Sequence, residues 1–556
     1  MHHGHSGGMA HHLLIKPRFG TQSRALVVDS YPTARSLLAA QLRALGVEQV
    51  TQCGRAGEVR QNMAARSYDV LVCEHSLADG TLGQDLIDEL RRGGLLGLGT
   101  VVLMVSSHAS YQVVAQVAES ALDGFIIKPY SVGDLEDRVL RAFVRKESLR
   151  DVIDALDEKR YADSLALCDA RFKARGPHWT SAARIGAELA IRQGQMALAT
   201  AMFEAVIEDR AVPWAKLGIA RVLEATDNKA EALSTVESLL SSEPTYADAY
   251  DVMGRIHAEQ GQFGAAINAY RQAAKITPHS VLRAQKYGIL SHYAGDPEEA
   301  LVALERAVAV GLVSPQFDHQ TLLLLTVCRY RSADADGLKQ CREQLDAAIA
   351  NPAIEGPRRD RLVRMGHLAQ GFERLLGGDA DGAIAHASDI AAGLMTPPFD
   401  AEAATNLLAL VSAAAAAGGV LPLAEDWVRD AGLRFCVSKH ATELLMKACE
   451  GAPPYAELLR TAHAEIGEAT RNALSEGLAG RHRQAAETLL RWAERTLNAK
   501  LLEVTEATLA RYRERIDDAD ELSERCEALK ERNGRALRTR LLAESDDTAS
   551  GGLWLP

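Results

Sequence analysis

Short apolar runs alternate with amphipathic stretches from Arg24 to Lys128. The runs are rich in β-branched residues, and most of them end in a polar side chain. Because this pattern is typical of strands that are buried on both faces of a parallel sheet, we expect five strands. The stretches between them, such as 34–45 and 82–92, have helical character. The expected strands are 24–29, 47–52, 69–74, 101–106 and 124–128.

Five strands that alternate with helices predict a doubly wound α/β domain over residues 22–146. Ligands of such sheets bind where the parallel strands end, at their carboxyl edge. The polar residues of this chain gather at the same strand ends, and we expect them to form one site. They are Asp29, Ser30, Glu74, Ser106 and Lys128.

This set of residues resembles the receiver domain of two-component response regulators, in residue type and in order. Asp29 and Ser30 stand where that family has an acidic pair that holds Mg²⁺, and Glu74 stands where it has the phosphate-accepting Asp. Ser106 stands where the family has a residue that contacts the phosphoryl group. Lys128 stands where it has the lysine that closes the site, and Phe125 matches the aromatic switch position. The resemblance implies phosphoryl transfer from a His kinase with the help of Mg²⁺.

Two departures from the family pattern weaken that chemistry. Ser30 replaces the second acid, and Glu74 is one methylene longer than Asp, so Mg²⁺ would be bound weakly if at all, through Asp29 and Glu74. A misplaced attacking oxygen can cost about a hundredfold in rate. We therefore expect a pseudo-receiver in which Glu74 pairs permanently with Lys128. The alternatives are phosphorylation of Glu74 or Asp79, and a domain that is kept only for folding or dimerisation.

A helical repeat begins near residue 155. Gly218, Gly254 and Gly288 recur at nearly even spacing, each near a large residue, and Pro278 ends the clearest unit. Small residues let two helices approach closely, and a proline ends the second helix. The pattern and its spacing resemble the tetratricopeptide repeat (TPR).

These patterns divide the chain into five segments. After residue 350 the repeats weaken, and a plain antiparallel helical array would leave the same traces there. A last helical stretch over 496–516, which resumes after Asp517 and Asp518 and continues to 542, is expected to cap the solenoid or to dimerise. The segments are a leader or tag at 1–21, a receiver-like domain at 22–146, TPR repeats at 155–350, a degenerate TPR-like region with C-terminal helices at 351–542, and a tail at 543–556.

Stacked helical hairpins form a concave face that binds peptides or partner helices. We expect this groove to bind another signalling protein, such as a kinase, a regulator or a signalling enzyme. The alternative is that the receiver or the C-terminal helices cover part of this face. The positions expected to face inward are Asp251, Arg255, Glu259, Gln285, Ile289 and Tyr293.

Composition excludes several other classes of function. The chain of 556 residues has a net charge of −12 and no concentrated basic stretch, so we expect no nucleic-acid partner. No apolar run is long enough to span a bilayer. Its eight cysteines are scattered, as expected for reduced thiols in a cytoplasmic protein.

The sequence predicts a non-enzymatic protein of bacterial-type signal transduction. No nucleophile–base pair or phosphate-binding loop stands out beyond the receiver site. The protein would act by protein–protein binding through its solenoid, and a homodimer is compatible with the pattern. The competing hypothesis is a response regulator whose receiver still accepts phosphate and gates the solenoid.

Overall fold

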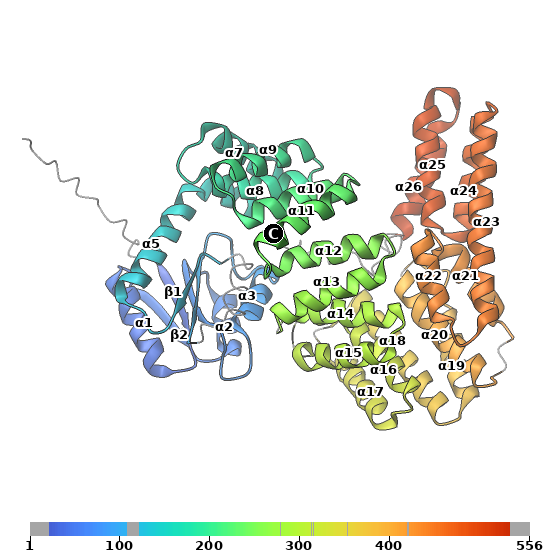
Figure 1. Ribbon diagram of the computed structural model, residues 1–556, viewed down its shortest axis with the longest axis horizontal. Helices are drawn as coiled ribbons and strands as arrows, with labels where there is room; N and C mark the ends of the chain where they lie inside the picture. Colours follow the sequence, from blue (N-terminus) through green and yellow to red (C-terminus); the bar gives the residue numbers. More distant parts are fainter. Residues whose placement is uncertain are drawn as a thin grey trace, which may run out of the picture. The chain divides into compact units, whose positions relative to one another are not determined.

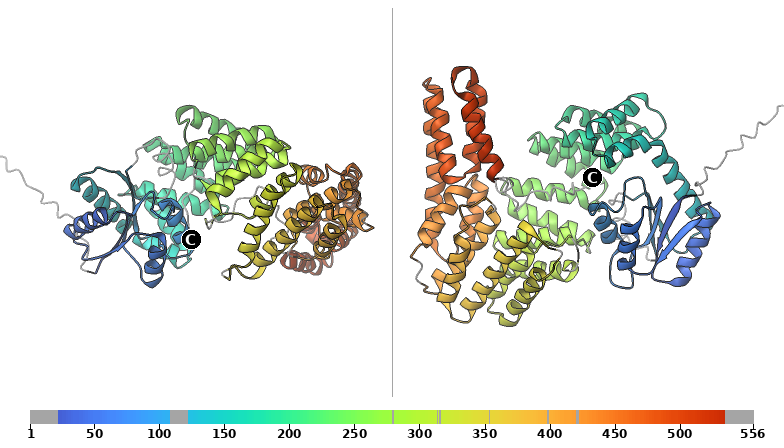
Figure 2. Two further views of the ribbon diagram at one scale, coloured as in Figure 1. Left: turned by 90° about the horizontal axis from the view of Figure 1, so that it is seen from below. Right: turned by 180° about the vertical axis from the view of Figure 1, so that it is seen from behind.

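The computed structural model describes residues 22–107 and 122–533, except 279, 313, 315, 353, 398, 420 and 421. The chain forms two compact units, which divide between residues 246 and 247 (Figure 1). The first unit contains the sheet and the first helices, and the second unit is helical (Figure 2). The expected leader 1–21 and tail 543–556 lie outside the described residues.

The first unit begins with a five-stranded parallel sheet in the order β2-β1-β3-β4-β5. All the strands that pair are parallel, so their carboxyl ends share one edge of the sheet. The prediction of five strands and their order along the chain is confirmed, with bounds that differ slightly at the ends. The strands are β1 (Arg24–Val28), β2 (Gln49–Cys53), β3 (Val70–Glu74), β4 (Val101–Ser106) and β5 (Gly124–Ile127).

Helices cover both faces of this sheet. One face packs against α1 and α5, through side chains such as Leu38 and Val139. The other face packs against α2 and α3, through Val59 and Ile87. The central strands β1, β3 and β4 are apolar on both faces because both are covered. These helices are α1 (Pro32–Ala44), α2 (Ala56–Ala65), α3 (Gly83–Arg92) and α5 (Val132–Ser148).

The sheet domain is joined to the helical hairpins of the same unit through α5 and α6. Nζ of Lys146, at the end of α5, donates to the carbonyl oxygens of Leu98 at 2.7 Å and Thr100 at 2.5 Å. Leu98 also packs against the core of the following helices. Those helices are α6 (Arg150–Asp157), α7 (Tyr161–Ala174), α8 (Trp179–Arg192), α9 (Met196–Asp209), α10 (Pro213–Ala225) and α11 (Lys229–Ser242).

The second unit is built from helices throughout the part that the structure describes. Its helices are α12 (Ala247–Glu259), α13 (Phe263–Ile276), α14 (Val281–Ala294), α15 (Pro297–Gly311), α16 (Gln320–Arg331), α17 (Ala335–Ile349), α18 (Gly356–Leu376), α19 (Ala380–Ala391), α20 (Ala401–Ala416), α21 (Ala424–Phe435), α22 (Lys439–Ala448), α23 (Pro453–Leu478), α24 (His482–Thr496), α25 (Ala499–Tyr512) and α26 (Ala519–Asn533), with a short 3₁₀ turn η1 (Arg513–Arg515) before α26.

Each hairpin from α6/α7 to α20/α21 turns on one residue with a left-handed backbone. The turn residues lie 33–35 residues apart up to Gly295, then 38 residues apart to Ala333 and 40–45 beyond it, so the regular period ends after Gly295. Three of them are not glycine and carry no obvious sequence signal. The turn residues are Lys159, Gly194, Asp227, Gly261, Gly295, Ala333, Gly378 and Gly418.

The three glycines that defined the repeat lie where two helices touch. A Cβ added to Gly218 would lie 2.4 Å from the ring of Phe203, and one added to Gly254 would lie 2.8 Å from the ring of Tyr270. Gly288 is similarly closed off by Leu304, at 2.9 Å. Glycine at these positions therefore sets the distance between the packed helices.

The last helical stretch is divided differently from the prediction. Thr496 ends α24, Leu497 has a left-handed backbone, and Asn498 caps α25 by accepting hydrogen bonds from the amides of Lys500 and Leu501. The expected stretch from Thr496 to Ile516 therefore begins later than predicted, at Ala499, because this cap ends one helix and begins the next. The expected break at Asp517 and Asp518 lies between η1 and α26. Residues 534–542 lie outside the described part.

No helix in the described ranges is both long and apolar enough to cross a membrane.

Replacing Gly254 by Ala tests the close packing directly. The new Cβ would meet the buried Tyr270 ring at 2.8 Å, so we expect the free energy of unfolding to fall by about 1–3 kcal/mol. The matched control is Gly264→Ala in the partner helix α13, where no atom lies within 4 Å. That variant should be as stable as the native chain or more stable by up to about 1 kcal/mol. Equal effects in chemical unfolding would contradict the packing role.

Candidate functional site

The ends of four strands bring the polar residues together at one edge of the sheet. Asp29 follows β1, Glu74 ends β3, Ser106 ends β4 and Lys128 follows β5. Asp29 is fully buried, and Glu74 and Ser106 are 5% and 3% exposed. The grouping follows from parallel pairing, because each strand delivers its last residues to the same place.

Lys128 places its ammonium between two carboxylates. Nζ lies 2.6 Å from Oδ2 of Asp29 and 3.1 Å from Oε1 of Glu74. Desolvation acts to lower the pKa of Lys128, but the hydrogen bonds and charges of Asp29 and Glu74 together outweigh it, and the pKa is raised. Lys128 therefore remains a cation and offsets negative charge inside the site.

The remaining carboxylate oxygens are held by backbone amides. Oδ1 of Asp29 accepts a hydrogen bond from the amide of Tyr31 at 2.9 Å, and Oε2 of Glu74 accepts one from the amide of Ser30 at 3.1 Å. The Glu74 carboxylate thus bridges the chain after β1 and the lysine after β5. Its orientation is fixed from both sides.

Ser30 holds the loop between β3 and α3 through its side chain. Its Oγ accepts a hydrogen bond from the amide of Ala78 at 2.7 Å. Arg35 adds a second tie, because Nη1 donates to the carbonyl oxygens of Asp29 at 2.6 Å and Ser30 at 3.2 Å. The sequence did not predict either contact. A hydroxyl residue in a strand-to-helix turn is the signal that could have indicated the first one.

The donors of this site fit Mg²⁺ poorly. The metal needs near-ideal octahedral oxygen coordination. Here the position between the two carboxylates is taken by the ammonium of Lys128, and the hydroxyl of Ser30 already accepts from Ala78. Among the residues that the structure describes, no group of three or more His, Cys, Asp or Glu could hold a metal ion.

Asp79, the alternative phosphate acceptor, has its carboxylate bound by backbone amides. Oδ2 accepts from the amide of Ala56 at 2.9 Å, at the start of α2, and Oδ1 accepts from the amide of Thr81 at 3.1 Å. Burial acts to raise the pKa of Asp79, but these hydrogen bonds outweigh it and the pKa is lowered. This geometry gives Asp79 a structural role in joining two loops.

The two other predicted residues lie on neighbouring strands. The carbonyl oxygen of Ser106 accepts a hydrogen bond from the amide of Lys128 at 2.8 Å, which holds β5 against β4. Phe125 lies in β5 beside Met104 of β4 and packs half-buried against the core. Both are next to the site, as the sequence order predicted.

Comparison with known proteins supports this reading of the fold. Residues 25–140 match the family described as the response regulator receiver domain, and residues 147–286 match the tetratricopeptide repeat-like domain. The chain carries a receiver domain followed by a TPR-like domain. The resemblance inferred from the residues is therefore confirmed for both parts.

Two curated relatives support the receiver domain. The chemotaxis protein CheY of Pseudomonas aeruginosa is 25% identical over 122 residues, which are 22% of this chain and 97% of the relative. The chemotaxis protein CheY-3 of Vibrio cholerae serotype O1 is 24% identical over 122 residues, 22% of this chain and 92% of the relative.

One solved structure resembles the helical part only distantly. It is the C-terminal part of a TPR repeat-containing protein from Cytophaga hutchinsonii, at 12% identity and a TM-score of 0.35, and the match covers 44% of this chain and 94% of that one. A TM-score of this size supports no conclusion about function.

The expected open groove is not present at the predicted positions of the second unit. Asp251, Arg255, Gln285 and Tyr293 are all at most 7% exposed, and Ile289 is partly buried in a core cluster. Among the six residues expected to face a partner, Glu259 is exposed. The prediction that this set lines an open groove is therefore wrong.

An ion cluster between neighbouring helices buries Asp251. Nε of Arg283 in α14 lies 2.9 Å from Oδ2 of Asp251, and its Nη2 lies 2.7 Å from Oδ1 of Asp248, both in α12. Nη1 donates to the hydroxyl of Thr277 at 2.8 Å. These side chains join successive hairpins rather than facing solvent.

Later parts of the same unit cover α14. Oε1 of Gln285 accepts from the amide of Asp318 at 2.6 Å, and its Nε2 donates to the carbonyl oxygen of Gln316 at 3.2 Å. Tyr293 packs beside Leu324 of α16. The physical reason for the error is that the chain before α16, and α16 itself, fold over this face. The sequence analysis considered such covering, but by the receiver or the C-terminal helices.

Replacing Lys128 by Met should destabilise the receiver domain. Removing one member of a buried ion pair costs about 3–5 kcal/mol, and the 21% exposure of the Lys128 side chain moves the expected loss to roughly 2–3 kcal/mol. Hydrogen exchange of the β1 and β3 amides measures this loss locally. The double variant with Glu74→Gln should lose less than the sum of the single variants, by about 1–3 kcal/mol. Strict additivity would show that the pair carries no coupling.

Replacing Arg283 by Met tests whether the groove positions are structural. Asp248 and Asp251 would remain buried without their partner, so we expect the second unit to lose about 3–5 kcal/mol. Glu259→Gln on the exposed end of α12 is the control and should change stability by no more than about 0.5 kcal/mol. Thermal unfolding of both variants makes the comparison. A fully stable Arg283 variant would show that the ion cluster adds nothing to the stability of the second unit.

Proposed function

We propose that this protein is a non-enzymatic, response-regulator-like signalling protein whose receiver is held in one state. The observation that carries the proposal is the ammonium of Lys128 between Asp29 and Glu74, with the second Glu74 oxygen bound by the amide of Ser30. Lys128 in this position supplies internally the positive charge that the phosphorylation chemistry of a receiver takes from a metal ion.

The two sequence departures act together in this proposal. The longer side chain of Glu74 reaches the Ser30 amide, and the hydroxyl that replaces the second acid holds Ala78 in the loop after β3. A phosphodonor would then meet a carboxylate whose two oxygens are both occupied. Mg²⁺ would bind weakly, if at all, through Asp29 and Glu74.

The helical part supplies the binding activity. TPR-like folds commonly bind proteins, and the class of partner that fits a receiver is another signalling protein, namely a kinase, a regulator or a signalling enzyme. Because Asp251, Arg255, Gln285 and Tyr293 are buried, the interface would lie on other exposed helix surfaces. In this proposal the protein acts in the cytoplasm and binds neither nucleic acid nor a membrane. A homodimer is compatible with the proposal.

The second candidate is a phosphorylation-controlled regulator. It is favoured by the grouping of Asp29, Ser106 and Lys128 at one sheet edge, which matches the receiver family apart from Ser30 and Glu74. In that case the phosphate would enter at Glu74 or Asp79 and change the exposure of the helical surface.

Incubation of the full chain with acetyl phosphate and Mg²⁺ distinguishes the two candidates. We expect the intact mass to remain unchanged, because both oxygens of Glu74 are engaged. The matched variant Ser30→Asp with Glu74→Asp restores both acids and shortens the acceptor, and we expect it to gain one phosphate. A stoichiometric phosphate on Glu74 or Asp79 of the native chain would establish the second candidate instead.

A further inference from the structure

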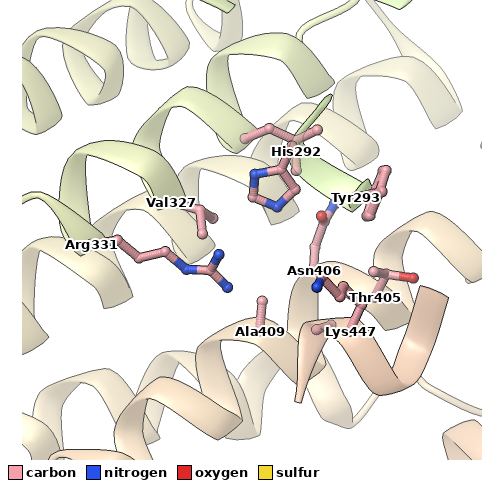
Figure 3. A pocket seen from close by; sticks show the side chains of 10 residues that line it. His292, Tyr293, Val327, Arg331, Thr405, Asn406, Ala409 and Lys447 are labelled. Atoms are coloured by element: carbon pink, nitrogen blue, oxygen red, sulfur yellow. The ribbon is translucent and has the colours of Figure 1, made fainter. Parts of the chain in front are cut away.

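A small cavity lies between four helices of the second unit. Its walls come from α14, α16, α20 and α22, which are widely separated in sequence and meet here (Figure 3). The lining includes His292 and Tyr293 from α14, Arg331 from α16, Asn406 from α20 and Lys447 from α22. The receiver site and the buried ion cluster of Arg283 use none of these side chains.

The polar groups of the lining are mainly hydrogen-bond donors. Arg331 and Lys447 are cations, and no Asp or Glu is among the lining residues. Thr405, the remaining hydroxyl of the lining, already donates to the carbonyl oxygen of Ala401 at 2.8 Å. A cavity lined mainly by donors is suited to a ligand that is rich in acceptors.

One buried donor of the lining lacks a protein partner. Tyr293 is 7% exposed, and among the described residues its hydroxyl has no partner at full hydrogen-bond geometry, although the side chain of Gln320 is close enough to act on its pKa. A buried hydroxyl without a partner costs free energy, which a bound acceptor would recover. Asn406 beside it is fixed by Gln320, whose amide exchanges two hydrogen bonds of 2.9 Å with it.

The electrostatic environment of the cavity is positive at His292. Burial is the largest effect that lowers the pKa of His292, and the charges of Arg331 and Lys447 lower it further. Glu450 lies near both cations, at 3.8 Å from Arg331 and 2.5 Å from Lys447, but its side chain is 44% exposed. The side chains of Arg331 and Lys447 are 38% and 35% exposed, so Glu450 offsets part of their charge and leaves the pair of cations with a net positive charge.

We propose that this cavity is a binding site for a small carboxylate or a similarly sized oxyanion. Arg331 and Lys447 supply the charge at one side, and His292, Tyr293 and Asn406 supply neutral donors. The size of the cavity restricts the ligand to a few atoms. The competing explanation is that Arg331 and Lys447 only stabilise the ends of α16 and α22, in whose last turns they lie.

The test compares formate with gluconate on the full chain at constant ionic strength. Both are carboxylates of charge −1, but gluconate is too large for the cavity. We expect formate to raise the thermal unfolding midpoint of the native chain by about 2 °C over gluconate. The double variant Arg331→Gln with Lys447→Gln should lose this difference. The control Arg358→Gln with Arg359→Gln removes the same charge from an exposed part of α18 and should keep it.

Tyr293→Phe gives a second test that leaves the packing intact. It removes only the hydroxyl without a partner, so the variant should fold and the shift produced by formate should fall to half or less. This variant decides the question if the double variant fails to fold. An equal effect of formate and gluconate on the native chain, or an undiminished formate shift in Tyr293→Phe, would overturn the proposal.

Discussion

The position of the Lys128 ammonium is the constraint on which the rest of the receiver site depends. Two carboxylates cannot remain charged and buried within a few ångströms of each other unless a cation offsets them. Lys128 meets this condition for Asp29 and Glu74 at 2.6 and 3.1 Å. The second oxygen of Glu74 accepts from the Ser30 amide, and the Ser30 hydroxyl accepts from the amide of Ala78. The charge balance of the site therefore depends on Lys128.

In the helical hairpins of both units, arginine side chains offset the charge of buried carboxylates. In the first unit, Nη1 of Arg221 lies 2.7 Å from Oε1 of Glu188 with both side chains buried. In the second unit, Arg283 and Arg361 each bridge two acids, which for Arg361 are Asp318 at 2.9 Å and Glu402 at 2.6 Å. The planar guanidinium can satisfy two carboxylates at once, which an ammonium does with less geometric control. These contacts fix the register between successive hairpins, and they occupy surface that an open solenoid would offer to a partner.

The sequence predicted the features that depend on local pattern. The strands are continuous apolar runs, and parallel pairing brings Asp29, Glu74 and Lys128 together without further information. Gly254 identified a close helix crossing because the residue that faces it, Tyr270, is on the adjoining helix. Features that depend on distant segments could not be predicted in this way. Asp251 has the position and the charge of a groove residue, and only the place of Arg283, in the next hairpin, shows that it is buried.

The junction between the receiver and the first hairpins lies at the other edge of the sheet from Lys128. Lys146 binds the carbonyl oxygens of Leu98 and Thr100, just before β4, and lies 2.9 Å from Asp123, just before β5. Burial lowers the pKa of Lys146, and Asp123 opposes that effect. The polar contacts of this junction therefore lie at the amino ends of β4 and β5, away from Asp29 and Glu74. The helix α5 begins after β5 and carries Lys146 at its other end, so one helix joins the edge that holds Lys128 to the first hairpins.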